Sequence, residues 1–470
     1  MSFHLFLFFS LLLKLASSSA AAIITTLPGY NASLPFTLET GYVGVDDEKQ
    51  QLFYYFVESQ RDPSADPILF WISGGPGCSS LWAFFYENGP LNFNLSYTFD
   101  GTLPQLIDNE YAWTKFMNIL YLDGPAGTGF SYSITQEGYN TSNFKFAANL
   151  NEFIHKWLES HDQFSTNAIY ISGDGFSGNP IPIALEEILN DNEAGVKPYV
   201  NMGGYVLVSP GTDFDLDFNS RIPYANRMGL ISDEIFEVAK EYCNGSYINP
   251  TSDECKLTME IINQLISNIN TAHILEPACR YAILPSSKSN SLLHRSLQED
   301  FTTFLDQPAD APPMPWCRKY NHEVANVWVN FEGVKEALQV REGTQPSEWQ
   351  LCNTTVDNQT YYKDDIKSVV SYHKNLSNTN IRGIILSGSH DMDIPNISTQ
   401  QWIWSLGLSL VESWRVWSVD NETAGYTRKF ENGDFSLTYA TVKGAGHFTP
   451  EYKPKECYYM VYNWTSGLPL

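Results

Sequence analysis

The fold of this chain is decided by the stretch Ile169-Tyr-Ile-Ser-Gly-Asp-Gly-Phe-Ser-Gly178. A short β-branched and aromatic run over residues 168–171 predicts a buried strand. A glycine-rich turn follows, and an apolar run over residues 181–188 then predicts a helix. The stretch therefore predicts a strand, a sharp turn and a helix in direct succession.

This succession fits a nucleophile elbow, G-x-S-x-G, in which a strained turn lifts a serine to the end of an α/β-hydrolase sheet. Here the frame is present, but its central position is Gly175, which has no side chain. Two other interpretations stay open on this stretch alone, a plain structural turn and a phosphate-binding turn at a helix N-terminus. Asp174 in the turn, and the lack of a Walker or complete G-x-G-x-x-G spacing, weigh against phosphate.

Length and charge restrict the class of protein. The chain has 470 residues, of which 43% are hydrophobic and 14% aromatic, and its formal net charge is −25. This length suits one large α/β domain with an insertion, or two domains. The negative charge argues against nucleic acid and anionic membrane surfaces as partners. It suits a soluble protein in an acidic compartment, although solubility alone would explain it equally well.

The N-terminus predicts entry into the secretory pathway. An apolar run over residues 5–16 is followed by small residues, which is typical of a cleaved signal peptide over residues 1–22. The run is too short for a stable membrane span, and no later stretch reaches that length. The expected destination is the vacuole or the extracellular space.

Entry into the secretory pathway allows glycosylation at the sequons and disulfides between the cysteines. The N-x-S/T sequons, candidate glycosylation sites, are at Asn31, Asn94, Asn140, Asn244, Asn353, Asn358, Asn375, Asn396, Asn421 and Asn463. The seven cysteines are too scattered for metal-ligand spacing and predict disulfides with one thiol left over. We expect no metal site and no cofactor.

Strands alternate with helices on both sides of the elbow. Residues 36–59 predict a β-hairpin, and residues 67–72 predict a buried strand that runs into Ser73-Gly-Gly-Pro-Gly-Cys-Ser-Ser80. Consecutive glycines after a strand let backbone N–H groups approach a ligand, as an oxyanion hole requires, although an ordinary Gly-Pro turn is the alternative.

The remaining core elements complete the pattern. Strands are expected at residues 118–123, 205–208, 384–386 and 439–442, and helices at 146–158, 332–340 and 454–464. This alternation predicts a largely parallel sheet with right-handed crossovers.

A change in composition and in predicted secondary structure marks an insertion. Residues 213–320 are polar, helical in pattern and rich in cysteine, and predict a helical cap inserted into the sheet domain formed by 23–212 and 321–470. Within the cap, residues 283–315 predict an exposed loop that is a candidate for cleavage during maturation.

An acid and a histidine follow the last two predicted parallel strands. Asp391 comes after the strand at 384–386 and His447 after the strand at 439–442, which gives the chain order nucleophile, acid, base. Asp391 would orient His447, and His447 would act as the general base. A lone Asp or His at the end of a strand is more often a solvated loop residue. Here, however, the elbow, Asp391 and His447 all follow predicted strands in the order that the fold requires.

Five motifs together resemble the serine carboxypeptidase family. They are Ser73–Ser80, Asp123–Tyr132, Gly173–Gly178, Ser387–Asp391 and Gly444–His447. The resemblance covers essentially the whole mature chain. It implies an α/β-hydrolase fold with a mixed, mostly parallel sheet, helices on both faces and an inserted helical cap. It further implies oxyanion-hole N–H groups at Gly75 and Phe176. The implied disulfides are Cys78–Cys352, Cys243–Cys255 and Cys279–Cys317, with Cys457 free.

Two substrate-binding positions differ from the peptidases. Carboxypeptidases of this family hold the peptide's terminal carboxylate with an Asn before the double glycine and a Glu before the nucleophile. Here these residues are Ser73, which precedes Gly74, and Asp174, while Glu87 stays at the position of the other pocket acid. The shorter side chains, and the stretches 424–428 and 451–454, resemble plant serine carboxypeptidase-like acyltransferases. Those enzymes transfer acyl groups from glucose esters through an acyl-enzyme.

Gly175 stands where the family's serine attacks. Phe448, Ser389 and the sequon at Asn396 are further departures close to the same site. The sequence therefore predicts a degenerate triad and a non-catalytic companion that forms a hetero-oligomer with an active acyltransferase paralogue. One alternative is an active enzyme in which His447 and Asp391 drive direct transfer from a 1-O-acyl glucose ester to a hydroxyl acceptor. Residual carboxypeptidase action is the weaker alternative.

Overall fold

The structure is a computed structural model, and it describes residues 21–95, 102–278, 318–341, 348–357 and 361–470. One twelve-stranded sheet runs through it in the order β1-β2-β3-β7-β4-β10-β11-β13-β16-β15-β14, with β8 paired to β3. The strands are β1 (Ala22–Ile24), β2 (Leu38–Val45), β3 (Gln50–Val57), β4 (Ile68–Ile72), β7 (Asn118–Leu122), β8 (Tyr132–Ser133), β10 (Ile169–Asp174), β11 (Met202–Val208), β13 (Arg382–Gly388), β14 (Ser409–Val419), β15 (Glu422–Asn432) and β16 (Phe435–Val442).

The centre of the sheet is parallel and its two margins are antiparallel. Strands β7, β4, β10, β11, β13 and β16 pair in parallel, whereas β1, β2 and β3 on one side and β15 and β14 on the other pair antiparallel. Two small ribbons lie outside this sheet, β5 (Leu91–Phe93) with β6 (Leu106–Asp108), and β9 (Thr141–Ser142) with β12 (Tyr362–Lys363). The mixed, mostly parallel sheet confirms the predicted α/β-hydrolase fold.

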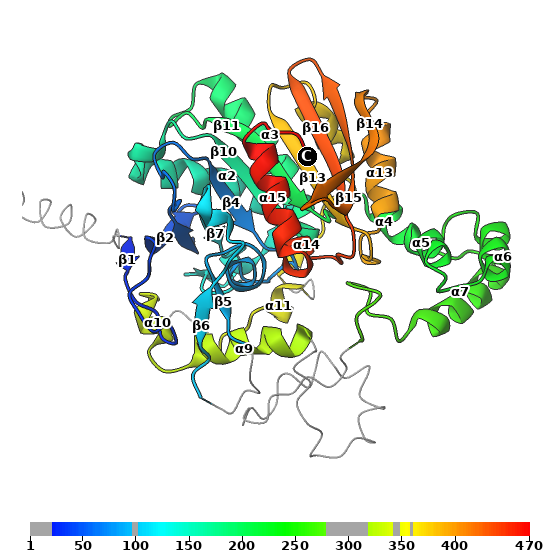
Figure 1. Cartoon of the computed structure of the whole chain (residues 1–470), viewed down its shortest axis with the longest axis horizontal. Coiled ribbons are helices and arrows are strands. Elements are labelled where there is room, and N and C mark those ends of the chain that lie inside the picture. Colours follow the sequence, from blue (N-terminus) through cyan, green and yellow to red (C-terminus); the bar gives the residue numbers. More distant parts are fainter. Residues whose placement is uncertain (1–20, 96–101, 279–317, 342–347, 358–360) are drawn as a thin grey trace, which may run out of the picture.

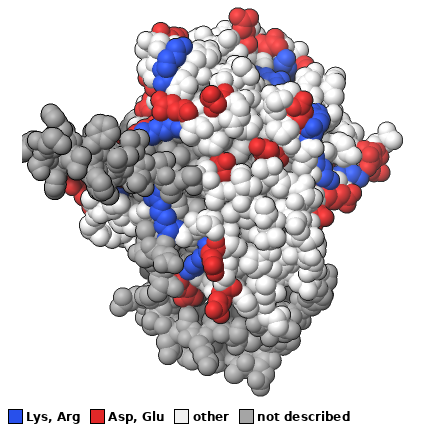
Figure 2. All heavy atoms as spheres, turned by 90° about the vertical axis from the view of Figure 1, so that its left-hand side faces the viewer, with Lys and Arg blue, Asp and Glu red and all other residues white. Residues whose placement is uncertain are grey.

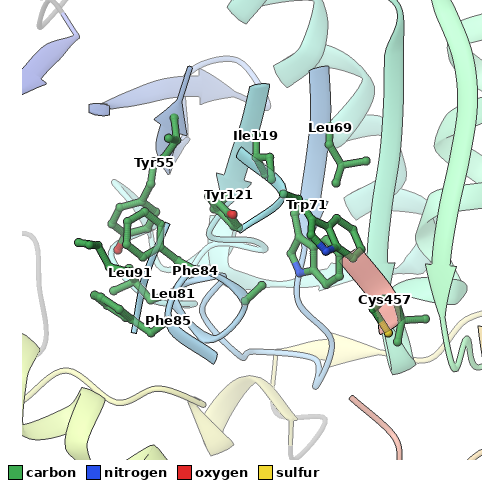
Figure 3. Packing of buried hydrophobic residues seen from close by; sticks show 14 of the residues in the cluster. Tyr55, Leu69, Trp71, Leu81, Phe84, Phe85, Leu91, Ile119, Tyr121 and Cys457 are labelled. Atoms are coloured by element: carbon green, nitrogen blue, oxygen red, sulfur yellow. The ribbon is translucent and has the colours of Figure 1, made fainter. Parts of the chain in front are cut away.

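Helices cover both faces because the central strands bury side chains on both sides. Ile68, Phe70 and Ile72 of β4 pack in one cluster with α2 (Asn143–Ser160) and α3 (Pro180–Ala194). The alternate residues Leu69 and Trp71 pack on the other face with α15 (Pro454–Thr465). Figure 3 shows part of this second cluster, in which side chains of β4 and β7 lie near Cys457 of α15. A strand buried on both faces has the continuous apolar run seen here.

Further helices complete the sheet domain. They are α9 (Arg318–Asn330), α10 (Val334–Ala337), α11 (Thr354–Asp357), α12 (Val370–Leu376), α13 (Asn396–Ser405) and α14 (Thr449–Tyr452). A single π-helical turn, η1 (Ala83–Glu87), follows β4, and a 3₁₀ turn, η5 (Gly175–Gly178), joins β10 to α3. The remaining 3₁₀ turns are η2 (Trp113–Lys115), η3 (Glu137–Tyr139) and η4 (Asp162–Phe164).

The segment expected to form the cap is helical where the structure describes it. It comprises α4 (Phe214–Asn219), α5 (Arg221–Arg227), α6 (Asp233–Cys243) and α7 (Asp253–Ile266), and α6 and α7 lie far from the sheet in Figure 1. These helices have an apolar cluster of their own, which Met392 and Ile397 of the sheet domain join. The predicted linker 283–315 and the pair Cys279–Cys317 lie outside the described residues.

The predicted helix bounds after the insertion differ from those in the structure. The helix expected at 332–340 is only α10, because Gly333 adopts a left-handed conformation with φ 86° just before it. The main helix of this region is α9, which begins at Arg318, inside the range assigned to the cap. Ala22, the last residue assigned to the signal peptide, pairs with Thr40 in the sheet, and cleavage of residues 1–22 stays a prediction.

Strands β14 and β15 were not predicted. β14 is the edge strand, and most of its side chains are exposed, so it lacks the apolar run that identifies the central strands. The strand expected at 439–442 begins earlier, at Phe435, because its first residues pair with β15.

The surface carries both signs of charge. On the face drawn in Figure 2, acidic and basic side chains are interspersed among uncharged residues. None of the helices within the described part of the chain combines the length and the apolar character needed to cross a bilayer.

Candidate active site

The site forms where the carboxyl ends of parallel strands meet. The loops that follow β4, β10, β13 and β16 carry Gly75, Gly175, Asp391 and His447, and all four strands belong to the parallel centre of the sheet. Parallel strands place their carboxyl ends at one edge of a sheet, which is where α/β proteins bind ligands. The fold therefore brings together residues separated by up to 372 positions in the chain.

Gly175 occupies the elbow and faces the histidine. Its φ is +51°, a left-handed conformation in which a side chain is strained. A Cβ atom built on Gly175 would lie 2.6 Å from His447 Nε2. The imidazole thus occupies space that any side chain at residue 175 would need.

Asp391 holds His447 in place. Nδ1 of His447 lies 2.9 Å from Asp391 Oδ2, and Oδ1 of the same carboxylate accepts hydrogen bonds from the backbone N–H groups of Asp393 and Ile394 at 2.8 and 3.1 Å. The backbone N–H of His447 donates to the carbonyl of Ala272, 2.8 Å away, so the helical insertion also fixes the loop. The structure brings the predicted acid and base into contact.

This pairing favours the charged imidazole. Burial on its own would lower the pKa of His447, but the charge and the hydrogen bond of Asp391 more than reverse this, and the pKa rises to about 9. Asp391 is fully buried, and burial raises its pKa while His447 opposes that effect. The Asp391 carboxylate therefore favours the protonated form of His447.

Two backbone N–H groups line the same site. Gly75 has a φ of +118°, and a Cβ built on Gly74 would lie 3.1 Å from Phe176 N, so the two loops approach closely. Gly75 and Phe176 both line the cavity that His447 also lines. This is the arrangement that an oxyanion hole requires.

The elbow contains one hydroxyl, and it points elsewhere. Ser177 Oγ donates to the carbonyl of Ile72 at 2.8 Å, and the side chain is buried. Ser177 therefore supports the start of α3 and does not substitute for a nucleophile.

The predicted substrate-binding acids lie beside the elbow. Asp174 Oδ1 accepts a hydrogen bond from Gly74 N at 3.3 Å, and burial raises the pKa of Asp174 to about 6 against the opposing effects of His447 and this bond. Glu87 is buried in η1, and both carboxyl oxygens lack a hydrogen-bond partner among the described residues. Burial raises the pKa of Glu87 well above its ordinary value, and Asp174 and Glu451 raise it further. Ser73 Oγ accepts from Trp71 Nε1 at 3.2 Å.

Glu451 was not singled out from the sequence as a site residue. It is buried, and Arg318 Nη1 and His322 Nε2 both bind its Oε1, at 2.9 and 2.8 Å. These contacts hold the pKa of Glu451 below its usual value although burial alone would raise it. The partners come from α9, which the sequence did not predict, so no sequence signal indicated them.

A cavity of about 370 Å³ opens beside these groups. Its wall includes Gly75, Gly175, Phe176 and His447, and apolar and aromatic side chains line it together with polar and charged ones. Those side chains are Phe214, Phe218, Tyr362, Ile366 and Ile394. They come from three distant segments, and no local motif could have identified them.

Phe448 and Ser389, two residues near His447 that differ from the family pattern, each contact another part of the structure. Phe448 packs on Trp82, with ring centroids 4.7 Å apart. Ser389 Oγ accepts a hydrogen bond from Gly444 N at 2.9 Å and so joins the loops that carry Asp391 and His447.

Asp391, Asp393 and His447 also place three potential metal-ligating atoms within 4.8 Å of one another. Both carboxylate oxygens of Asp391 are, however, already hydrogen-bonded, one to two backbone N–H groups and one to His447. The residues therefore fit a hydrogen-bonded acid–base pair better than a metal centre.

Two of the three expected disulfides are present, Cys78–Cys352 and Cys243–Cys255, and Cys457 is free and buried. Cys78 lies in the loop that carries Gly75, and a Cβ atom built on Gly75 would be 3.3 Å from Cys78 Sγ. The Cys78–Cys352 disulfide therefore anchors this loop.

The sequons differ in exposure. Asn31, Asn140, Asn244, Asn375 and Asn421 are exposed, Asn94, Asn353, Asn396 and Asn463 are half-buried, and Asn358 lies outside the described residues. Asn396 opens α13 and does not line the cavity. Glycosylation at these positions stays a prediction.

Comparison with known proteins agrees with this geometry. A family model described as serine carboxypeptidase matches residues 28–467. Serine carboxypeptidase-like 17 and serine carboxypeptidase-like 7 of Arabidopsis thaliana are each 42% identical to the chain, over 100% and 99% of its length and 98% of their own. A solved structure of a prohormone-processing carboxypeptidase from Saccharomyces cerevisiae matches with a TM-score of 0.72 and 18% identity over 95% of each chain. This last likeness concerns the fold alone.

Proposed function

The chain belongs to the serine carboxypeptidase family, and we propose that within it the protein is a non-catalytic member of the acyltransferase branch. In this proposal it keeps the fold and ligand pocket of a glucose-ester-dependent acyltransferase. It acts as the companion subunit of an active paralogue, in the vacuole or outside the cell.

The observation that carries the proposal is the relation between Gly175 and His447. The elbow, the Asp391–His447 pair and the two N–H groups are all in place, but the residue facing Nε2 has no hydroxyl. Loss of the nucleophile from a serine protease triad costs roughly a factor of 10⁶ in turnover. A chain without it can bind the ligands of its relatives but cannot form an acyl-enzyme at this residue.

The pocket acids support the acyltransferase branch over a peptidase. Asp174 is tied to the backbone of Gly74, and Ser73 accepts a hydrogen bond from Trp71. Both side chains are shorter than the Glu and Asn with which the peptidases hold a terminal carboxylate. The chain therefore lacks the reach that recognition of a peptide end would need.

Direct transfer, with His447 as the base for an acceptor hydroxyl, is the alternative. A general base must be neutral to accept a proton, and the most effective base has a pKa near the working pH. The pKa of about 9 keeps His447 protonated in a neutral or acidic compartment. The raised pKa of His447 thus disfavours direct transfer.

The two disulfides suit an oxidising compartment, as expected for secretory proteins. Delivery to the vacuole or the cell exterior is part of the proposal and is tested by locating a fluorescent fusion of the full chain.

The companion role is tested by co-expression. The full chain is produced alone and together with an acyltransferase paralogue that has a serine at the elbow, and the two are assayed for co-purification and for transfer from a 1-O-acyl glucose ester. We expect no turnover by the chain alone, a stable complex, and higher activity or yield of the paralogue in the complex. Turnover by the chain alone, or failure to associate with any paralogue of the same species, contradicts the proposal.

A further inference from the structure

Three exposed aromatic rings gather on one surface of the sheet domain. Trp404 of α13, Trp414 of β14 and Tyr426 of β15 are 48%, 40% and 40% exposed, and α13 lies beside these two strands in Figure 1. None of the three lines the cavity at Gly175. Single exposed apolar side chains are ordinary, but several together on one surface usually mark a place where something binds.

The three rings, here called the aromatic platform, are held in place by one arginine. The rings of Trp414 and Tyr426 are nearly parallel, with an interplanar angle of 7° and centroids 5.6 Å apart. The guanidinium carbon of Arg428 lies 4.6 Å from the ring centroid of Trp414 and 5.4 Å from that of Trp404. Arg428 therefore joins the indole of the edge strand to the indole of the helix.

The sequon Asn396-Ile-Ser lies on the same helix face as one of these rings. Asn396, Gln400 and Trp404 are spaced four residues apart in α13, and residues with this spacing share one face of a helix. Gln400 Nε2 donates a hydrogen bond to the carbonyl of Asn396 at 3.3 Å, and Gln400 Oε1 accepts one from Arg428 Nη2 at 3.2 Å. A chain of contacts thus runs from the sequon to the arginine of the platform.

A second chain of contacts runs through the sheet. Tyr439 Oη donates to the carbonyl of Asn396 at 3.4 Å, and the ring centroid of Tyr439 lies 6.2 Å from that of Trp414. The side chain of Asn396 is half-buried and makes no hydrogen bond to any described residue. The sequon therefore lies next to the platform with an amide that no other side chain occupies.

We propose that Asn396 carries an N-linked glycan whose first sugar rings lie on the aromatic platform. The inference rests on the secretory entry that forms part of the proposed function, and it does not depend on the companion role. In the attachment step, Asn396 Nδ2 loses a proton and forms a bond to C1 of the first N-acetylglucosamine. The C1–O bond to the lipid diphosphate that donates the oligosaccharide breaks, and the diphosphate leaves.

The chemistry of the platform suits a sugar. A pyranose ring has a face of C–H groups, and the face of an aromatic ring carries the negative part of its quadrupole, so the two faces attract each other. Arg428 adds N–H donors beyond the one that binds Gln400, and these can reach sugar hydroxyls.

A tethered glycan fits this surface better than a second copy of the chain. The formal net charge of −25 makes two copies repel each other. The glycan core is uncharged, and its attachment to Asn396 keeps it at a high effective concentration over the rings.

The first test is the occupancy of the sequon. The full chain is produced through the secretory pathway of plant cells and treated with a peptide N-glycosidase in ¹⁸O-labelled water, which converts each glycosylated Asn to a labelled Asp. We expect the label at Asn396 in most molecules by peptide mass spectrometry. An unmodified Asn396 in the purified protein overturns the proposal.

Hydroxyl-radical footprinting then shows where the glycan lies. Oxidation of Trp414 and Tyr426 should rise severalfold in Asn396→Gln, because the rings lose their cover, whereas Tyr199, which is 53% exposed elsewhere, should not change. Asn140→Gln removes another exposed sequon and is the matched control, with no expected change at the platform. Equal oxidation of Trp414 in the unaltered chain and in Asn396→Gln contradicts the proposal.

A double-mutant cycle measures the contact itself. Trp414→Ala should raise the unfolding equilibrium constant in urea about threefold to tenfold more in the glycosylated chain than in Asn396→Gln, the range found for contacts between rings. The loss of the stack on Arg428 is common to both backgrounds and cancels.

The remaining outcomes are equally distinct. Equal effects of Trp414→Ala in the two backgrounds overturn the proposal, as does protection of the rings in Asn396→Gln that increases with protein concentration, which would assign the platform to a second copy. All measurements use the chain alone, so their failure leaves the co-purification test of the companion role unaffected.

Discussion

Ser177 Oγ donates a hydrogen bond to the carbonyl of Ile72, 2.8 Å away, at the junction of β4 and the elbow. Ser177 is 1% exposed, so the bond lies in the interior. It binds the start of α3 to the strand that precedes the oxyanion loop. The one hydroxyl of the elbow thus has a structural role.

Ser177→Ala should therefore reduce the stability of the protein. Removing the hydroxyl leaves the Ile72 carbonyl without this donor, at a cost of about 1–3 kcal/mol in the free energy of unfolding. Urea unfolding monitored by tryptophan fluorescence measures this. An unchanged free energy of unfolding would show that this hydrogen bond does not stabilise the fold.

Gly175→Ser and Gly175→Ala should destabilise the protein about equally. Both put a Cβ on a residue with φ +51° and within 2.6 Å of His447 Nε2. The backbone strain alone costs about 1–2 kcal/mol, and the imidazole must move away from its present position.

The same pair of variants separates packing from chemistry. After incubation with an activated acyl ester, intact-protein mass spectrometry should detect an acyl adduct on Gly175→Ser and on neither Gly175→Ala nor the unaltered chain. An adduct on the unaltered chain would contradict the non-catalytic assignment. No adduct on Gly175→Ser would show that the site has diverged beyond this one residue.

His373 should make the protein less stable in acid. It is fully buried in α12, stacks on Trp402 with ring centroids 4.6 Å apart, and burial lowers its pKa to about 3. An unfolded histidine has a pKa near 6.5, so between pH 6.5 and 3 the unfolded chain binds the proton that the folded chain excludes. The contribution is complete above pH 6.5 and is lost as the pH falls, by about 2–3 kcal/mol at pH 4.5.

His373→Phe tests this sign. The free energy of unfolding of each protein is measured in urea at pH 7.5 and 4.5, and the loss on acidification should be smaller for the variant. Other titrating groups act on both proteins alike and cancel in the difference. An equal loss would show that His373 is protonated in the folded state.

The Cys78–Cys352 disulfide should matter for both stability and the site. It joins positions 274 residues apart and anchors the loop that carries Gly75. Replacing both cysteines with Ala in the Gly175→Ser variant should cost about 2–5 kcal/mol in the free energy of unfolding and slow formation of the acyl adduct, because Gly75 N–H is held less firmly.

Cys243→Ala with Cys255→Ala is the matched control. That disulfide links α6 to α7, and its cysteines lie 12 positions apart. In the same Gly175→Ser background we expect lower stability of these helices and unchanged adduct formation, measured by thermal unfolding and mass spectrometry. Equal effects of the two pairs of cysteine replacements on adduct formation would contradict the local role of Cys78–Cys352.

The sequence by itself determined the central sheet and the elbow, and it singled out Asp391 and His447, which the structure brings into contact. Strands such as β4 and β10 are buried on both faces, so their apolar runs are continuous, and the turns after them need glycines that local sequence displays. Two of the predicted disulfides followed from the family resemblance and are present.

Only the tertiary structure decided how the imidazole of His447 sits over Gly175, which side chains form the cavity, and how Glu451 is bound by α9. These features join segments hundreds of residues apart, and each segment alone carries no periodic or motif signal. The edge strands β14 and β15 were missed for a related reason, since exposed strands gain their order from pairing with β16 and not from an apolar pattern of their own.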